Sequence, residues 1–298
     1  MEETLIKQFA EKKSKEKVQE FYEKTLSILT TALDKLRNEE KENCLEYNDT
    51  RIFPMGDYTN DTFIDQTGEL EIVIATANPS IKIANSTYIK SLKEAKSKKQ
   101  KSNISNKGTF DSIINKMYHC LAEYFDNTTV LLLINQGIKI LCLKEYGFKI
   151  LIRFATYDEE DKNAVLSFWD PLQKNIKKVD LFSYNERMEE KDKDTTGNYK
   201  KLVRIFKNVR KNILMTKWAL SSDLNKYFVE LIVYNIPNCL MQGEDLVNIF
   251  NKCLNYLDNC DVTKFKSFDG RKINTFDLAK VNYSKIKNFV NYAVKIAY

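Results

Sequence analysis

Two glutamates, Glu69 and Glu71, occupy alternate positions in a segment that reads Glu-Leu-Glu-Ile-Val-Ile-Ala. The apolar second half of this segment is typical of a buried β-strand over residues 69–75. Because side chains at i and i+2 of a strand point to the same face, we expect the two carboxylates to lie side by side. Such a pair can hold a divalent cation, or it can be the solvated start of a strand. Both interpretations remain open from the sequence.

The surrounding elements must position these carboxylates. Short apolar runs predict further strands at 130–134, 138–143 and 147–154. Apolar residues at helical spacing predict a long helix over 1–40, an inserted helix over 110–125, and a C-terminal set at 199–216, 226–233, 245–257 and 283–297. A helix, a small sheet and then a helical bundle make an α+β protein.

Composition excludes several classes of protein. The net charge of +6 comes from 47 basic and 41 acidic residues, an excess that permits but does not require a nucleotide or nucleic-acid ligand. The six cysteines include no CxxC pair, and His119 is the only histidine, so we expect reduced core thiols rather than a zinc site. No signal peptide and no membrane-spanning run is visible, which predicts a cytoplasmic chain without a membrane partner. The lysine-rich stretch 90–101 is interpreted as exposed.

Three local patterns carry a family resemblance. The first consists of Phe53-Pro-Met-Gly-Asp-Tyr-Thr-Asn-Asp-Thr62 followed by Gly68-Glu-Leu-Glu-Ile-Val-Ile74, the second covers 198–210, and the third covers 227–235. Together with the order of elements, they resemble the nucleotidyltransferases related to cyclic-dinucleotide synthases and oligoadenylate synthases, the CD-NTase group. The resemblance implies a bilobal, polymerase beta-like fold with a small mixed sheet. The nucleotidyltransferase core would cover 1–190 and the helical lobe 191–298, with 188–198 as the connection.

The resemblance also implies a site. Residues of the turn, Gly56, Asp57 and Thr62, would hold the phosphates of a nucleoside triphosphate, together with Lys207 and Lys226. Glu69 and Glu71 would be the catalytic, metal-binding pair that grips two Mg²⁺ ions.

This chain departs from the family pattern at several of those positions. Asp57 replaces a serine and repels phosphate by like charge, although Lys226 offsets part of this. Glu69 and Glu71 replace aspartates, and a carboxylate displaced by about 1 Å can lower a rate by about 100-fold. The family's third acid falls on 148–155, where Leu151 stands instead. A rearranged site would need a ligand from Asp61, Asp65 or the acidic loop 158–161.

Structural interpretations stand beside these roles. Lys207 and Arg204 can form an exposed helix face, and His119 can be a packed or surface histidine. Trp169 and Trp218 fit a core or an interface better than a base-stacking platform.

Three functions remain open. The chain can be a nucleotidyltransferase-fold protein with an impaired metal site that binds a nucleotide, a protein or an RNA. It can be an active Mg²⁺-dependent nucleotidyltransferase that uses Glu69 and Glu71. It can also be an unrelated helical binding protein, which a structure without a sheet would favour.

Overall fold

The computed structural model describes residues 1–11, 16–39, 50–64, 69–76, 117–123, 130–133, 137–142, 148–157, 165–170, 175–216, 226–268 and 283–297. The chain divides into two compact units. The helical unit combines Met1–Lys13, Gly56–Gly68 and Phe182–Tyr298. The sheet unit combines Ser14–Met55 and Glu69–Leu181.

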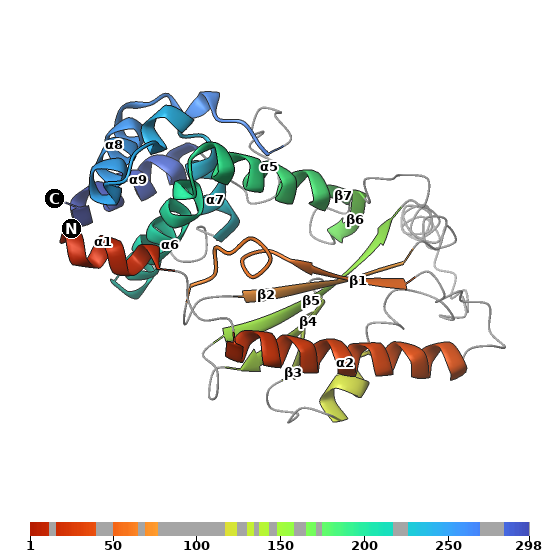
Figure 1. Ribbon diagram of the computed structural model, residues 1–298. Helices are drawn as coiled ribbons and strands as arrows, with labels where there is room; N and C mark the ends of the chain where they lie inside the picture. The colour runs from red at the N-terminus through yellow and green to blue at the C-terminus, as the bar shows by residue number, and fades with distance from the viewer. Residues whose placement is uncertain are drawn as a thin grey trace. The chain divides into compact units, whose positions relative to one another are not determined.

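The sheet unit contains a seven-stranded mixed sheet (Figure 1). Its main path runs β1-β2-β5-β4-β3, and β6 pairs with both β5 and β7. β2 and β5 are parallel, whereas the other pairs are antiparallel. The strands are β1 (Thr50–Met55), β2 (Glu69–Thr76), β3 (Val130–Leu133), β4 (Gly137–Cys142), β5 (Phe148–Tyr157), β6 (Val165–Asp170) and β7 (Asn175–Asp180).

One helix of this unit, α2 (Glu16–Glu39), runs along the sheet in Figure 1. Its described buried residues recur at the spacing of one helix face and are Thr25, Ile28, Leu29, Ala32 and Leu33. Residues 117–123 form a further short helix, in which Met117 and Leu121 are fully buried. The α+β class predicted from the sequence is confirmed.

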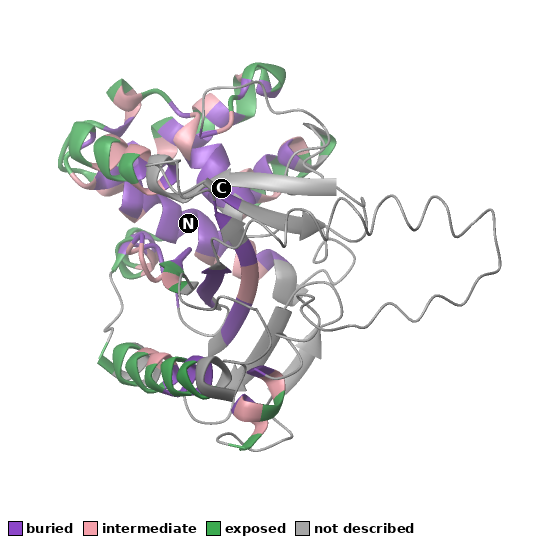
Figure 2. Cartoon of the chain, turned by 90° about the vertical axis from the view of Figure 1, so that its right-hand side faces the viewer, coloured by how far each residue is buried: buried purple, intermediate pink, exposed green. Residues whose placement is uncertain are grey.

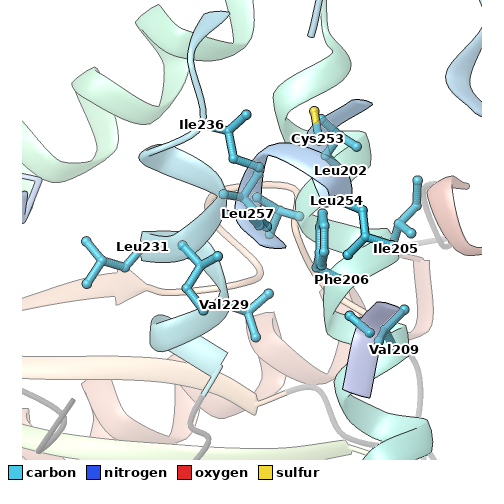
Figure 3. Packing of buried hydrophobic residues seen from close by; sticks show 14 of the residues in the cluster. Leu202, Ile205, Phe206, Val209, Val229, Leu231, Ile236, Cys253, Leu254 and Leu257 are labelled. Carbon is cyan, nitrogen blue, oxygen red and sulfur yellow. The ribbon is translucent and has the colours of Figure 1, made fainter. Parts of the chain in front are cut away.

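The helical unit has one apolar core, made largely by α6, α7, α8 and α9. Figure 2 shows the buried residues gathered inside these helices, and Figure 3 shows side chains of α6, α7 and α8 converging there. The elements are α1 (Glu3–Ala10), α5 (Leu181–Asp194), α6 (Asn198–Thr216), α7 (Lys226–Tyr234), η3 (Asn238–Met241), α8 (Leu246–Asn259), η4 (Val262–Lys264) and α9 (Tyr283–Ala297).

Three sequence expectations need correction. The predicted helix over 1–40 is two helices, α1 and α2, which belong to different units. Residues 188–198, expected as the connection between the lobes, lie inside the helical unit: α5 continues to Asp194, and the chain then turns into α6 through Thr196 and Gly197, both with positive φ. The strands β6 and β7 were not predicted: Asn-Ile-Lys-Lys-Val-Asp of β7 carries little apolar signal, whereas Val-Leu-Ser-Phe-Trp-Asp of β6 does carry one that was missed.

The division into units also differs from a single boundary between residues 190 and 191. α1 and the turn after β1 pack with the helical unit rather than with the sheet. The polar contacts responsible for this arrangement form the site described next.

Candidate functional site

The turn between β1 and β2 is folded tightly. Gly56 has φ +73°, which glycine adopts without steric penalty, and Asp61 has φ +56°. The amide of Asn60 donates to the Gly56 carbonyl at 3.1 Å, and the amide of Thr62 donates to the Asp57 carbonyl at 3.0 Å. These bonds bring Asp57 and Thr62 together, and both side chains are buried.

Lys207 on α6 binds this turn from within the helical unit. Its Nζ donates to Asp57 Oδ1 at 2.8 Å and to Thr62 Oγ1 at 2.9 Å, with a longer contact of 3.3 Å to the Thr62 carbonyl. A fourth contact runs to Glu230 Oε1 on α7 at 2.6 Å. The residue is only 1% exposed, so this ammonium is surrounded by protein oxygens rather than by water. The interpretation of Lys207 as part of an exposed helix face is therefore wrong.

Glu230 is the second centre of this network, which we call the Lys207 network (Asp57, Thr62, Tyr184, Lys207 and Glu230). Thr62 Oγ1 donates to Glu230 Oε1 at 2.8 Å, and the Tyr184 hydroxyl donates to Oε2. Glu230 is 1% exposed. Two carboxylates and one ammonium thus share a dry environment, where each hydrogen bond matters more than it would in water.

Arg204, one turn before Lys207, joins two further segments to α6. Its Nε donates to the Ala10 carbonyl at the end of α1, and its Nη1 donates to the Asp61 carbonyl in the turn, both at 2.7 Å. The residue is 6% exposed, so the exposed-face interpretation is wrong here too. Burial lowers the pKa of this guanidinium, while Asp192 and Asp61 raise it. The arginine fixes the turn and α1 to one helix.

The strand face that bears the glutamates has a different composition. The parallel register pairs Glu71 with Leu151 and Val73 with Arg153, so these four positions share one face of the sheet. Glu71 is 6% exposed, which contradicts a solvated strand start at that position. Its Oε1 accepts a contact from Arg153 Nη2 at 3.4 Å. An apolar residue and a cation therefore stand beside the carboxylate.

The described strand face offers Glu71 beside Leu151 and Arg153. Mg²⁺ requires several oxygen ligands in near-octahedral geometry. Within the described ranges, no group of three or more His, Cys, Asp and Glu side chains is placed to hold a metal ion. The strand position beside Glu71 offers Leu151, and the nearby charge on this face is the guanidinium of Arg153.

The remaining predicted residues are located as follows. Glu69 begins β2 and Lys226 begins α7, but their side chains lie outside the described part. Asp65 and the acidic loop 158–161 also fall outside it, as do the lysines of 90–101 and Trp218. His119 is exposed and contacts the Tyr118 ring edge-on, which agrees with a surface histidine.

Two findings bear on the expected chemistry and location. Burial raises the pKa of the Cys253 thiol to about 12, as expected for a reduced core cysteine, whereas Cys239 is exposed and is not a core residue. Among the described helices, none is both long enough and apolar enough to cross a bilayer.

Sequence reasoning gave no role to Glu230, Tyr184 or Arg153. A signal for Glu230 was present, because it is the single charge in the apolar run Phe-Val-Glu-Leu-Ile-Val of α7. A lone charge in such a run predicts a buried carboxylate with a partner. Arg153 carried no comparable signal.

Comparisons with known proteins agree with this architecture. Residues 186–297 match the family of cGAS/DncV-like nucleotidyltransferase C-terminal helical domains. A cyclic nucleotide synthase, CdnE01 of Staphylococcus haemolyticus, is 22% identical over 249 residues, which are 77% of each chain.

Solved structures extend the likeness to the whole chain. The CdnE cyclic dinucleotide synthase of Elizabethkingia meningoseptica, solved with GTP and Apcpp, has a TM-score of 0.69 at 15% identity and covers 99% of this chain and 98% of its own. The CdnE c-UMP-AMP synthase of Rhodothermus marinus has a TM-score of 0.67 at 17% identity, with 99% and 96% covered. E. coli MS115-1 CdnC, solved in a complex with HORMA-deltaN, has a TM-score of 0.62 at 11% identity, with 100% and 88% covered. The predicted resemblance and nucleotidyltransferase fold are confirmed, and an unrelated helical protein is excluded by the sheet.

Proposed function

We propose that this chain, a CD-NTase-like nucleotidyltransferase by its fold and its C-terminal family match, has an impaired two-metal site and retains the binding of a nucleotide or a partner. The observation that carries the proposal is the register of β2 and β5. It puts Leu151 beside Glu71 and brings Arg153 to that carboxylate at 3.4 Å. The Arg153 guanidinium beside Glu71 disfavours a divalent cation there, because two positive charges repel each other strongly where water is scarce.

The Lys207 network supports the same proposal from the helical unit. A lysine that binds a triphosphate needs free donors, yet the three protons of Lys207 face Asp57, Thr62 and Glu230. Asp57 adds a negative charge to the turn that would hold phosphates. Triphosphate would have to displace a buried ion pair before it met this ammonium.

The turn between β1 and β2 supports the retained binding of a ligand. Thr59 Oγ1 and Asn60 Nδ2 are buried and lack a hydrogen-bond partner among the described residues. Buried polar atoms are rarely left unsatisfied, so a turn with two of them is suited to a ligand with polar groups. Five of the similar structures are described as bound to nucleotides or analogues, which makes nucleoside triphosphates the first ligands to try.

The experiment incubates the purified chain with Mg²⁺ or Mn²⁺ and labelled ATP, GTP, CTP and UTP. We expect thermal stabilisation by at least one nucleotide and no pyrophosphate or nucleotide product above the background. The double variant Glu69→Ala, Glu71→Ala should behave like the unchanged chain in the product assay. A product that disappears in the double variant would refute the proposal.

That outcome would favour the second candidate, an active Mg²⁺-dependent nucleotidyltransferase. The name of its relative in Staphylococcus haemolyticus, a cyclic nucleotide synthase, is the observation that favours it. In that case Glu69 and Glu71 would be catalytic. A protein or RNA that supplies a missing group would also be required, because no third acid stands beside Glu71 on β5.

A further inference from the structure

Arg153 has hydrogen-bond donors that the described residues do not use. Its Nη2 lies 3.4 Å from Glu71 Oε1, which is long for a charge-assisted hydrogen bond. Its Nε atom is buried and has no hydrogen-bond partner in the described part of the chain. The side chain as a whole is 42% exposed, so a solute can reach it. A buried donor without a partner calls for an explanation, and a missing ligand is one.

The chemistry of the guanidinium restricts the kind of ligand. Arginine carries five N–H donors in a planar fork whose geometry matches phosphate and carboxylate oxygens in pairs. Glu71 contacts only one arm of this fork and is itself largely buried, with 8% of its side chain exposed. The other donors suit a second anion that approaches from solvent.

The charge beside Glu71 also favours an anion over a metal ion. The register places Glu71 two residues before the partner of Arg153, and the guanidinium contacts its carboxylate. The formal charges of this pair cancel, so it attracts a divalent cation less strongly than a lone carboxylate would.

We infer that Arg153 binds a phosphate group directly, without a divalent cation, and that the ligand is a polyphosphate, either of a nucleotide or free in solution. The inference rests on the proposed function, because a working two-metal site would place metal ions between phosphate and protein. The positive charge that a bound metal ion would place beside the phosphate comes instead from the Arg153 side chain.

Calorimetric titration of the full chain in EDTA tests this directly. ATP and inorganic tripolyphosphate are the two probes. We expect binding of at least one of them without divalent cation. Tighter binding of ATP would identify a nucleotide as the ligand, and equal or tighter binding of tripolyphosphate would identify the free polyphosphate. No binding of either probe in EDTA would overturn the inference.

Substitutions of Arg153 distinguish the effect of its paired donors from the effect of its positive charge. Arg153→Gln should weaken binding in EDTA by about tenfold or more, as expected when a charge-assisted hydrogen bond is lost. Arg153→Lys keeps the positive charge but loses the planar fork of donors. Its affinity should lie between that of Arg153→Gln and that of the unchanged chain. The matched control is Lys24→Gln, which removes the same charge from an exposed position on α2 of the same unit and should change nothing. Equal binding by Arg153→Gln and the unchanged chain would contradict the inference.

The substitution Glu71→Gln should change the affinity in opposite directions under the two hypotheses for Glu71. It removes the carboxylate that competes for Arg153, so polyphosphate should bind more tightly in EDTA. If Glu71 is instead a metal ligand, the same change should weaken nucleotide binding in Mg²⁺. Turnover with Mg²⁺ would refute the proposed function whatever happens in EDTA. An inactive chain that binds no polyphosphate in EDTA would refute only the role of Arg153.

Discussion

Lys207 in the helical unit and Arg153 in the sheet unit are both cations beside carboxylates, but their surroundings differ. Lys207 is 2% exposed at its side chain and makes ion pairs of 2.8 Å with Asp57 and 2.6 Å with Glu230. Arg153 is 42% exposed, and within the described part of the chain its one ion pair is the 3.4 Å contact with Glu71.

This difference separates a structural ion pair from one that is available to a ligand. Breaking a buried pair leaves a charge without compensation, whereas an exposed pair contributes little because water replaces it. The Lys207 network therefore holds the turn and α7 to α6. The Arg153 pair leaves part of its fork open. The lysine that the family resemblance assigns to phosphate is thus the less accessible of the two cations.

The largest expected effect comes from Lys207→Met. It leaves the buried carboxylates of Asp57 and Glu230 near each other, and we expect a loss of about 3–5 kcal/mol in the free energy of unfolding. Arg153→Gln should lose less than about 1 kcal/mol. Urea unfolding at pH 7 measures both.

A charge-removing variant serves as the control for this prediction. Adding Asp57→Asn and Glu230→Gln to Lys207→Met should recover part of the lost stability, because no uncompensated charge remains. Similar losses for Lys207→Met and Arg153→Gln would show that the two pairs do not differ as described.

A smaller effect is expected at Arg204, which extends the Lys207 network to α1. A lysine in its place cannot reach both the Ala10 and Asp61 carbonyls, so Arg204→Lys should lose about 1–3 kcal/mol. Hydrogen exchange should quicken together in peptides covering 1–11 and 56–64.

The comparison variant for Arg204 lies on the same helix. Lys201 is partly buried and, among the described residues, makes only a 3.3 Å contact with Asn198, so Lys201→Gln should leave both peptides protected. Faster exchange in one peptide alone after Arg204→Lys would mean that the arginine does not couple the two segments.

The sequence predicted the elements of the site better than its contacts. The apolar pattern of α6 predicted the helix, and the alignment of Leu151 with the missing acid agrees with its register beside Glu71. Both follow from local periodicity. Local sequence patterns could not predict the partners of Lys207, because Asp57 lies 150 residues away and Glu230 lies 23 residues away in the chain.

The burial of Lys207 shows why a helical pattern is not enough. Within α6, positions 202, 203, 205, 206, 207 and 209 are all buried. A lysine among such residues can be exposed at the edge of the buried face, or it can be buried. Which of the two holds depends on whether other segments bring carboxylates to it. The role of Arg153 was hidden for the same reason, since its register with β2 is a long-range property.

A pH-dependent effect is expected at Lys191, a third cation in a mixed environment. Its Nζ donates to the Ile236 carbonyl at 2.9 Å and to Asn238 Oδ1 at 2.6 Å, and it lies 5.3 Å from the centre of the Tyr234 ring. Burial lowers the pKa of Lys191 to about 8, against opposing contributions from Cys253 and Asp194. Unlike Lys207, this lysine makes no recorded ion pair within the described residues.

The sign of the pH dependence follows from proton binding. Below pH 8 the lysine is protonated in both the folded and the unfolded chain, and the burial of its charge destabilises the fold in full. Between pH 8 and the ordinary lysine pKa of 10.5, the unfolded chain binds a proton that the folded chain has lost, so stability rises with pH. Lys191→Met should remove this rise and leave an offset that does not depend on pH. Urea unfolding of both proteins from pH 7 to 10.5 measures the difference, in which the other titrating groups cancel. A difference that stays constant over this range would show that Lys191 keeps its proton in the fold and is held as firmly as Lys207.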